Sequence, residues 1–106
     1  MKSECVHLPV SIKWIELVDK HFRVDLKPRI AAYRKVADAA MEAALNGFVP
    51  KEPHDRISSC YLTKDDFGLM QAAVKKSGVK TEDFTQSEIV MMAIGLAVEA
   101  KKRGLV

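Results

Sequence analysis

The sequence predicts a mainly α-helical protein with one two-stranded antiparallel β-ribbon, formed by two strand–helix–helix units in a single chain. Three observations predict this fold class. The chain repeats itself at an offset of 53 or 54 residues, each half starts with a short extended segment, and each half continues with two amphipathic helical segments. With 106 residues, 48% of them hydrophobic and 29% charged, the chain is expected to fold as one compact domain.

The repeat is clearest in two places. Val6-His7-Leu8-Pro9 aligns with Cys60-Tyr61-Leu62-Thr63. An apolar pattern with helical spacing occurs in both halves, at Val36, Ala40, Met41, Ala44 and Leu45 and at Ile89, Ala93, Ile94, Ala97 and Val98. We therefore expect a first unit at residues 3–48, a linker with two prolines at 49–55, and a second unit at 56–106.

The second unit carries clear boundary signals. An extended segment at 56–62 stops at Thr63, which can cap a helix whose first turn holds Asp65 and Asp66. Gly78 predicts the end of that helix. The run Thr85-Gln86-Ser87-Glu88 matches a capping box, and the helix that it starts is expected to end at 101–103, before Gly104.

The first unit is less regular. Its extended segment is expected at residues 4–8, and Pro9-Val10-Ser11 predicts the start of its first helix, because proline suits the first turn. That helix carries Ile12, Ile15, Leu17, Val18 and Phe22. The second helix is expected to begin near Pro28 and to end at Asn46-Gly47.

A strand followed by two short amphipathic helices has no core of its own, so each unit needs a partner. If the two strands pair antiparallel above the four helices, the apolar stripes are buried and the outer face of the ribbon stays open. A two-stranded ribbon fits the major groove of B-DNA, where its outward side chains reach base edges. The pattern therefore favours a DNA-binding protein.

Leu62-Thr63-Lys64-Asp65-Asp66-Phe67, then Gly78, then Gln86-Ser87-Glu88-Ile89, resembles the ribbon-helix-helix pattern of the Arc and Met repressor superfamily. The resemblance covers residues 56–104 well and 3–47 more loosely. Two copies in one chain are similar to accessory DNA-binding proteins of conjugation, such as TraY and the VirC-operon protein that binds the T-DNA transfer enhancer. The resemblance implies a monomer that acts as a pseudo-dimer on double-stranded DNA, in several copies, with a relaxase or other transfer proteins as further partners.

Side chains of a strand alternate between its two faces. With Leu8 and Leu62 facing inward, Val6 and Cys60 join the core. The base-facing residues are then Ser3, Cys5, His7, Ile57, Ser59 and Tyr61. The family usually places Arg, Lys, Thr, Asn or Gln at such positions, so Cys5 and Ile57 depart from its pattern.

Phosphate contacts are expected beside the ribbon and at the start of each second helix. Arg56 lies next to the ribbon. In this family the N-terminus of the second helix holds a phosphate, which implies that role for Thr85, Gln86 and Ser87, and for the aligned Arg34 and Lys35. Capping for Thr85 and Ser87, and a solvated helix face for Arg34 and Lys35, are the alternative interpretations.

Other function classes find little support. No nucleophile–base pair, glycine-rich phosphate loop or converging carboxylates predict an enzyme or a cofactor, and Cys5, His7 and Cys60 lack the spacing of a zinc site. The net charge is only +3, divided evenly between the halves. No apolar run has the length of a membrane span or a signal peptide, so we expect a cytoplasmic protein with free thiols at both cysteines.

Four functions remain open. A relaxosome or transfer accessory protein is favoured, and a transcriptional repressor with the same ribbon is the main alternative. An antitoxin is less favoured, because the chain ends within three residues of its last expected helix. A helical interaction module without a DNA role is the fourth. Because the outward residues of the two strands differ, the preferred DNA site is expected to be non-palindromic.

Overall fold

The computed structural model describes residues 5–22, 29–50 and 57–106, with only the backbone described for Arg29 and residues 57–59. The elements follow in the order β1 (Cys5–Ser11), α1 (Ile12–Phe22), the short 3-10 helix η1 (Arg29–Ala31), α2 (Ala32–Leu45), β2 (Ile57–Thr63), α3 (Lys64–Lys76), the short 3-10 helix η2 (Thr81–Asp83) and α4 (Gln86–Lys102). The fold is thus mainly helical, with one two-stranded antiparallel sheet, as the sequence predicted.

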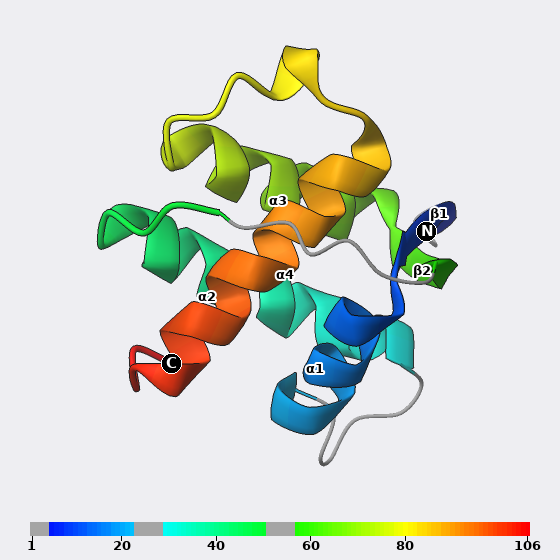
Figure 1. Ribbon diagram of the computed structural model, residues 1–106, viewed down its shortest axis with the longest axis horizontal. Coiled ribbons are helices and arrows are strands. Elements are labelled where there is room, and N and C mark those ends of the chain that lie inside the picture. Colours follow the sequence, from blue (N-terminus) through cyan, green and yellow to red (C-terminus); the bar gives the residue numbers. More distant parts are fainter. Residues whose placement is uncertain (1–4, 23–28, 51–56) are drawn as a thin grey trace.

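The two strands pair along their whole length. Cys5 lies opposite Thr63, Leu8 opposite Cys60, and Ser11 opposite Ile57. Figure 1 shows the ribbon at one side of the molecule, with α4 running through the centre between α3 on one side and α1 and α2 on the other. Both α2 and α4 begin on the side of the ribbon and end on the opposite side.

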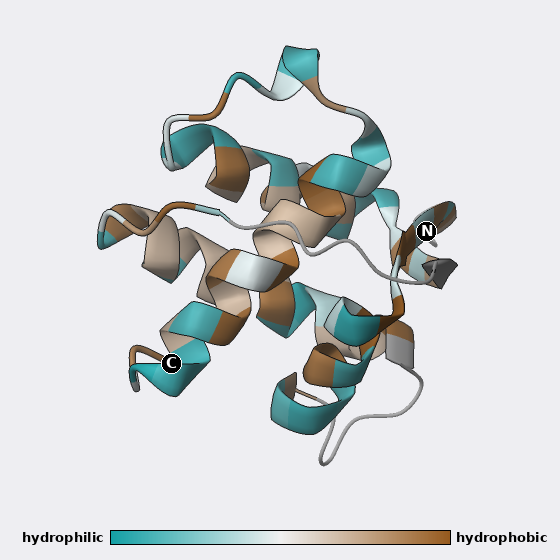
Figure 2. Cartoon of the chain, viewed as in Figure 1, coloured by the Kyte–Doolittle hydropathy of each residue, from teal (hydrophilic) through white to brown (hydrophobic). Residues whose placement is uncertain are grey.

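The core lies between the inner face of the ribbon and the four helices. Fully buried side chains come from every layer, including Val10 and Leu62 from the ribbon, Val18 from α1, Met70 from α3 and Ile94 from α4. The hydropathy colouring shows apolar residues on the facing sides of the helices and polar residues toward their ends (Figure 2). Trp14 packs against this core at its edge.

The helix boundaries predicted for the second unit are confirmed. Thr63 caps α3 by accepting a hydrogen bond from the backbone N–H of Asp66, and Thr85 and Glu88 form the capping box of α4. Gly78 follows α3 with φ at +100°, the left-handed conformation that favours glycine.

The predicted start of the first helix is wrong. Pro9 lies inside β1, which continues to Ser11, and α1 begins only at Ile12. A two-stranded ribbon tolerates proline because each of its strands is an edge strand. An offset of 52 residues therefore relates the ends of the two strands, since Cys5 and Ser11 correspond to Ile57 and Thr63. The alternation of Val6, Leu8 and Val10 was the signal that could have predicted the longer strand.

The second helix of the first half agrees with the prediction at its end and differs at its start. It ends at Leu45, followed by Gly47 with φ at +80°. At its start, η1 (Arg29–Ala31) precedes α2, and Pro28 lies outside the described residues. Leu45, the last member of the predicted apolar stripe, is 58% exposed, because the helix reaches beyond the core there.

Candidate nucleic-acid interface

The outer face of the ribbon is open. Cys5, His7 and Pro9 of β1 are exposed, and Tyr61 of β2 is 49% exposed, whereas Leu8, Cys60 and Leu62 are buried on the inner face. The predicted alternation is confirmed for these side chains. Because the strands are antiparallel and twisted, their outward side chains stand in one row that solvent can reach.

His7 and Tyr61 form the aromatic centre of this row. They are directly opposite each other, and their ring centroids lie 4.3 Å apart with the planes at 69°, an edge-to-face arrangement. This packing restrains both rings, and the imidazole and the phenol hydroxyl can each donate or accept hydrogen bonds. Two hydrogen-bonding groups on restrained rings suit recognition of base edges.

The other residues predicted to face bases are less fully placed. Ser59 lies opposite Pro9, and Ile57 lies opposite Ser11, at backbone level. Ser11 is fully buried at the junction with α1. Ser3 and Arg56 lie outside the described residues.

The start of α4 is occupied by its own cap. The Thr85 hydroxyl accepts a hydrogen bond from the N–H of Glu88 at 3.2 Å, and the N–H of Thr85 donates to the Glu88 carboxylate at 2.8 Å. These hydrogen bonds lower the pKa of Glu88. A phosphate at this helix end would have to use the amides of Gln86 and Ser87, which have no intrahelical partner, and would share the end with a carboxylate.

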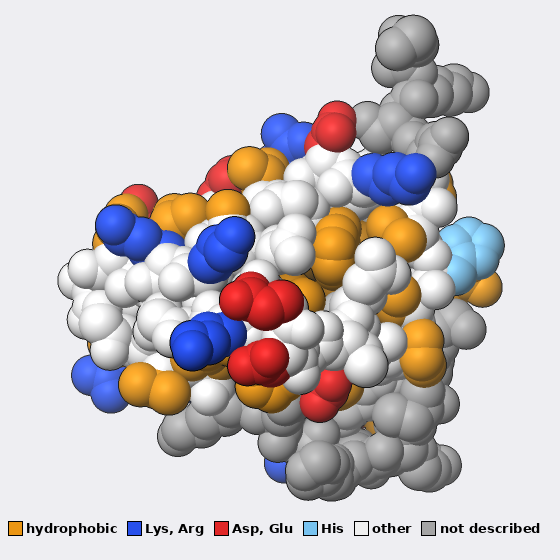
Figure 3. Space-filling view, turned by 90° about the horizontal axis from the view of Figure 1, so that it is seen from above, with side chains coloured by type: hydrophobic (Ala, Val, Ile, Leu, Met, Phe, Trp, Pro, Cys, Tyr) orange, Lys and Arg blue, Asp and Glu red, His pale blue; other side chains and the backbone are white. Residues whose placement is uncertain are grey.

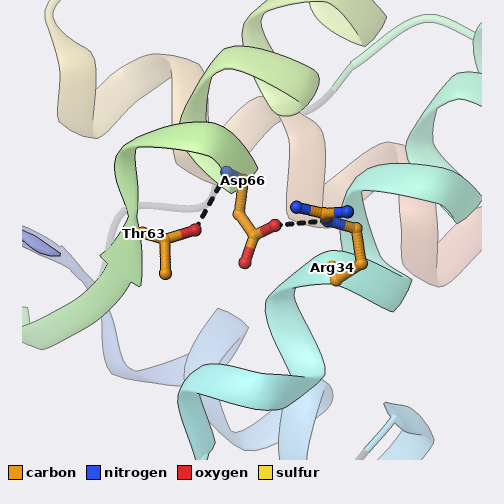
Figure 4. Close-up of polar contacts among 3 residues, drawn as sticks. All are labelled: Arg34, Thr63 and Asp66. Atoms are coloured by element: carbon orange, nitrogen blue, oxygen red, sulfur yellow. Dashed lines mark hydrogen bonds and ion pairs between the residues drawn. The ribbon is translucent and has the colours of Figure 1, made fainter. Parts of the chain in front are cut away.

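Arg34 contacts the other half of the chain. Its Nε donates to the carboxylate of Asp66 in the first turn of α3, and this hydrogen bond raises the pKa of the guanidinium (Figure 4). The Asp66 side chain is only 7% exposed, whereas that of Arg34 is 55% exposed. Thr63, Asp66 and Arg34 thus form a chain of polar contacts from the end of β2 to α2 (Figure 4). The sequence analysis treated Asp66 only as a first-turn acid and missed this contact.

Lys35 lies elsewhere. Its side chain lines a pocket together with Phe22 of α1 and Lys101 of α4, so the structure does not group it with Arg34. The offset of 53 that aligned Arg34 and Lys35 with the start of α4 also overlooks η1, which begins the helical segment at Arg29. Arg29, and not Arg34, is therefore the first described residue of that segment.

The charge distribution adds little to the interface. On the face drawn in Figure 3, Lys and Arg side chains are interspersed with Asp and Glu side chains. No group of three or more His, Cys, Asp or Glu within the described ranges could hold a metal ion, and Cys60 is buried on the face opposite to Cys5. None of the helices in those ranges is long and apolar enough to cross a membrane.

Comparison with known proteins gives no match. No family model matches the sequence, and neither a curated protein nor a solved structure matches the chain. Any functional conclusion therefore depends on the sequence pattern and on the geometry described above.

Proposed function

We propose that this protein binds double-stranded DNA sequence-specifically, by placing the outer face of the β1–β2 ribbon in the major groove. The observation that carries the proposal is the ribbon itself, which is buried on one face and open on the other, with His7 and Tyr61 packed together on the open face. A two-stranded ribbon has the width that the major groove admits.

In this proposal the chain is a single-chain ribbon-helix-helix pseudo-dimer. The common offset of 52 residues between the strands, and the position of both α2 and α4 with their first turns on the ribbon side, support it (Figure 1). Phosphates beside the groove would then meet the start of α4 and the start of η1. Helix N-termini attract phosphate through their unpaired amides.

The outward residues of the two strands differ, since His7 corresponds to Ser59 and Pro9 to Tyr61 at this offset. The preferred DNA site should therefore be non-palindromic. We propose that the protein acts as an accessory protein of conjugative transfer, with transcriptional repression as the alternative use of the same contacts. Footprinting on the DNA that flanks the gene tests this, because a strictly two-fold symmetric footprint would contradict the asymmetric recognition.

Binding can be tested by selecting duplexes from a randomised pool and measuring their affinity by fluorescence anisotropy at fixed salt. Tyr61→Ala should weaken binding of the selected duplex about tenfold to a hundredfold, since one base contact is worth about 1–3 kcal/mol. The matched control is Leu69→Ala on α3, which removes a side chain of similar exposure, 40%, away from the ribbon.

Tyr61→Phe separates the hydroxyl from the ring, and the combined change of Ser59 and Tyr61 to Ala should leave the fold intact. Failure to select any duplex, even at low salt where phosphate contacts are strongest, would refute DNA binding. A collapse of the melting temperature with unchanged binding would show that Tyr61 serves the core.

A further inference from the structure

A group of cations gathers where α1 and α4 end. Lys20 and His21 lie in the last turn of α1, Lys101 and Lys102 lie in the last turn of α4, and Lys35 of α2 lies beside them. We name these five residues the basic patch. Figure 1 shows that α1 and α4 both end away from the ribbon, and Figure 2 shows polar residues at both ends.

The members of the basic patch lie close together. The Nζ of Lys101 is 5.8 Å from the centre of the Phe22 ring. Burial and the positive charges of Lys20, Lys102 and Lys101 lower the pKa of His21, so these groups lie within electrostatic reach of one another. Charges repel more strongly when they are partly shielded from water.

A pocket of about 220 Å³ lies within the basic patch. The residues that line it are Phe22, Lys35, Asp38, Ala39, Lys101 and Val106. Among the described residues of its wall, Asp38 is the carboxylate side chain. The pocket therefore combines apolar surface with an excess of positive charge.

Stabilisation of helix ends does not explain this arrangement. Cations in the last turn of a helix interact favourably with the helix dipole, and each helix end obtains that benefit alone. Bringing the ends of α1 and α4 together adds repulsion between their lysines. Surface features that cost stability are often retained for binding.

We propose that the basic patch binds an acidic segment of a partner protein, with one apolar side chain of that segment in the pocket beside Phe22. The ammonium groups supply the charge complementarity. Nucleic-acid phosphate is less favoured, because the patch holds lysines without an arginine, the residue that pairs bidentately with phosphate, and because phosphodiesters offer no apolar group to the pocket. The pocket is also smaller than most small-molecule sites, which suits a single side chain.

The experiment uses the full chain and a short fluorescein-labelled peptide of Asp and Glu with one central Leu. The test variant reverses two charges of the basic patch, Lys101→Glu with Lys102→Glu. The matched control, Lys75→Glu with Lys76→Glu, reverses two charges in the last turn of α3. Circular dichroism melts confirm that both variants fold.

We expect the test variant to bind the peptide about tenfold more weakly than the control variant, and a peptide with Gly in place of Leu to bind the unchanged protein more weakly. Equal losses in the two variants, or no binding of either peptide by the unchanged protein, would overturn the proposal. A loss of affinity for duplex DNA specific to the test variant would overturn it in favour of a nucleic-acid surface. Because the peptide assay contains no DNA, its result is independent of ribbon function.

Discussion

The two halves of the chain start their helices by different means. In the second half, α3 and α4 each begin after a threonine that accepts a hydrogen bond from the third residue of the helix. In the first half, α2 follows Ala31, which has helical backbone angles and no side-chain cap, and the Ser11 hydroxyl before α1 is buried without a hydrogen-bond partner. The second half thus encodes its helix starts locally, whereas those of the first half depend on packing.

The halves also differ in how they contact each other. α3 packs extensively along α2, and the Arg34–Asp66 ion pair lies in this interface. The related pair, α1 with α4, has a smaller contact. α1 is therefore expected to be the least firmly held of the four helices, because fewer contacts oppose its local opening.

The largest expected difference between the halves concerns two aligned helix residues. Ile94 of α4 is fully buried, and Ile94→Ala should reduce the free energy of unfolding by about 2–5 kcal/mol. Met41, its counterpart in α2, is only partly buried, so Met41→Ala should cost less. Urea denaturation measures both, and equal losses would show that the two halves contribute equally to the core.

Removal of the cross-half ion pair should have the next largest effect. Asp66→Ala removes a carboxylate that is nearly buried and should reduce the free energy of unfolding by about 1–3 kcal/mol. The double variant with Arg34→Ala distinguishes pairing from other effects of the substitution. If the two single losses simply add in the double variant, the ion pair makes no contribution of its own.

Loss of a cap should affect the second half measurably. Thr63→Ala and Thr85→Ala should each cost about 1 kcal/mol of unfolding free energy, since each leaves a helical N–H without its acceptor. In the first half, Ala31→Ser should change stability little, because Ala31 lacks the extended backbone of a cap residue. Chemical denaturation checks all three, and a clear gain for Ala31→Ser would contradict the comparison.

Ser11 occupies the place of Thr63 at the offset of 52 residues, yet its replacement should have the opposite sign. Ser11→Ala removes a buried hydroxyl that has no hydrogen-bond partner, so stability should stay constant or rise by up to about 1 kcal/mol. A loss as large as that of Thr63→Ala would mean that the Ser11 hydroxyl caps α1 after all. Thermal melts of the two variants side by side decide between these outcomes.

The smallest expected effect is a dependence on pH. The pKa of Glu88 is lowered from its ordinary value of 4.5, so its contribution to stability is present above that pH and is lost as the pH falls through the lowered value. Glu88→Gln should remove this part of the acid dependence. Melting temperatures of the two proteins compared between neutral and acidic pH test it, and parallel curves would contradict it.

Much of the fold could be predicted, and the successes share one property. Thr63, Gly78 and the pair Thr85 and Glu88 act within a few residues of their own position, where sequence spacing fixes the contact. The inward and outward faces of the ribbon followed in the same way from alternation. Pro9 was misinterpreted because proline is compatible with a helix start and with an edge strand, and pairing with β2 decides between them.

The candidate site could be predicted only in part. The open face with His7 and Tyr61 follows from strand alternation, but the contact between their rings depends on the register of two strands separated by more than forty residues. Asp66 and Arg34, and Lys35 and Lys101, come from different helices, so no spacing in the sequence relates them.

By itself, the sequence determined the helix and strand content, the caps of the second half and the apolar faces, because backbone propensity, capping and periodicity act over a few residues. Only the tertiary structure decided how far β1 extends, which cation pairs with Asp66, and that the lysines of α1 and α4 converge. Those features arise where distant segments pack, and packing depends on the shape and charge of both surfaces at once.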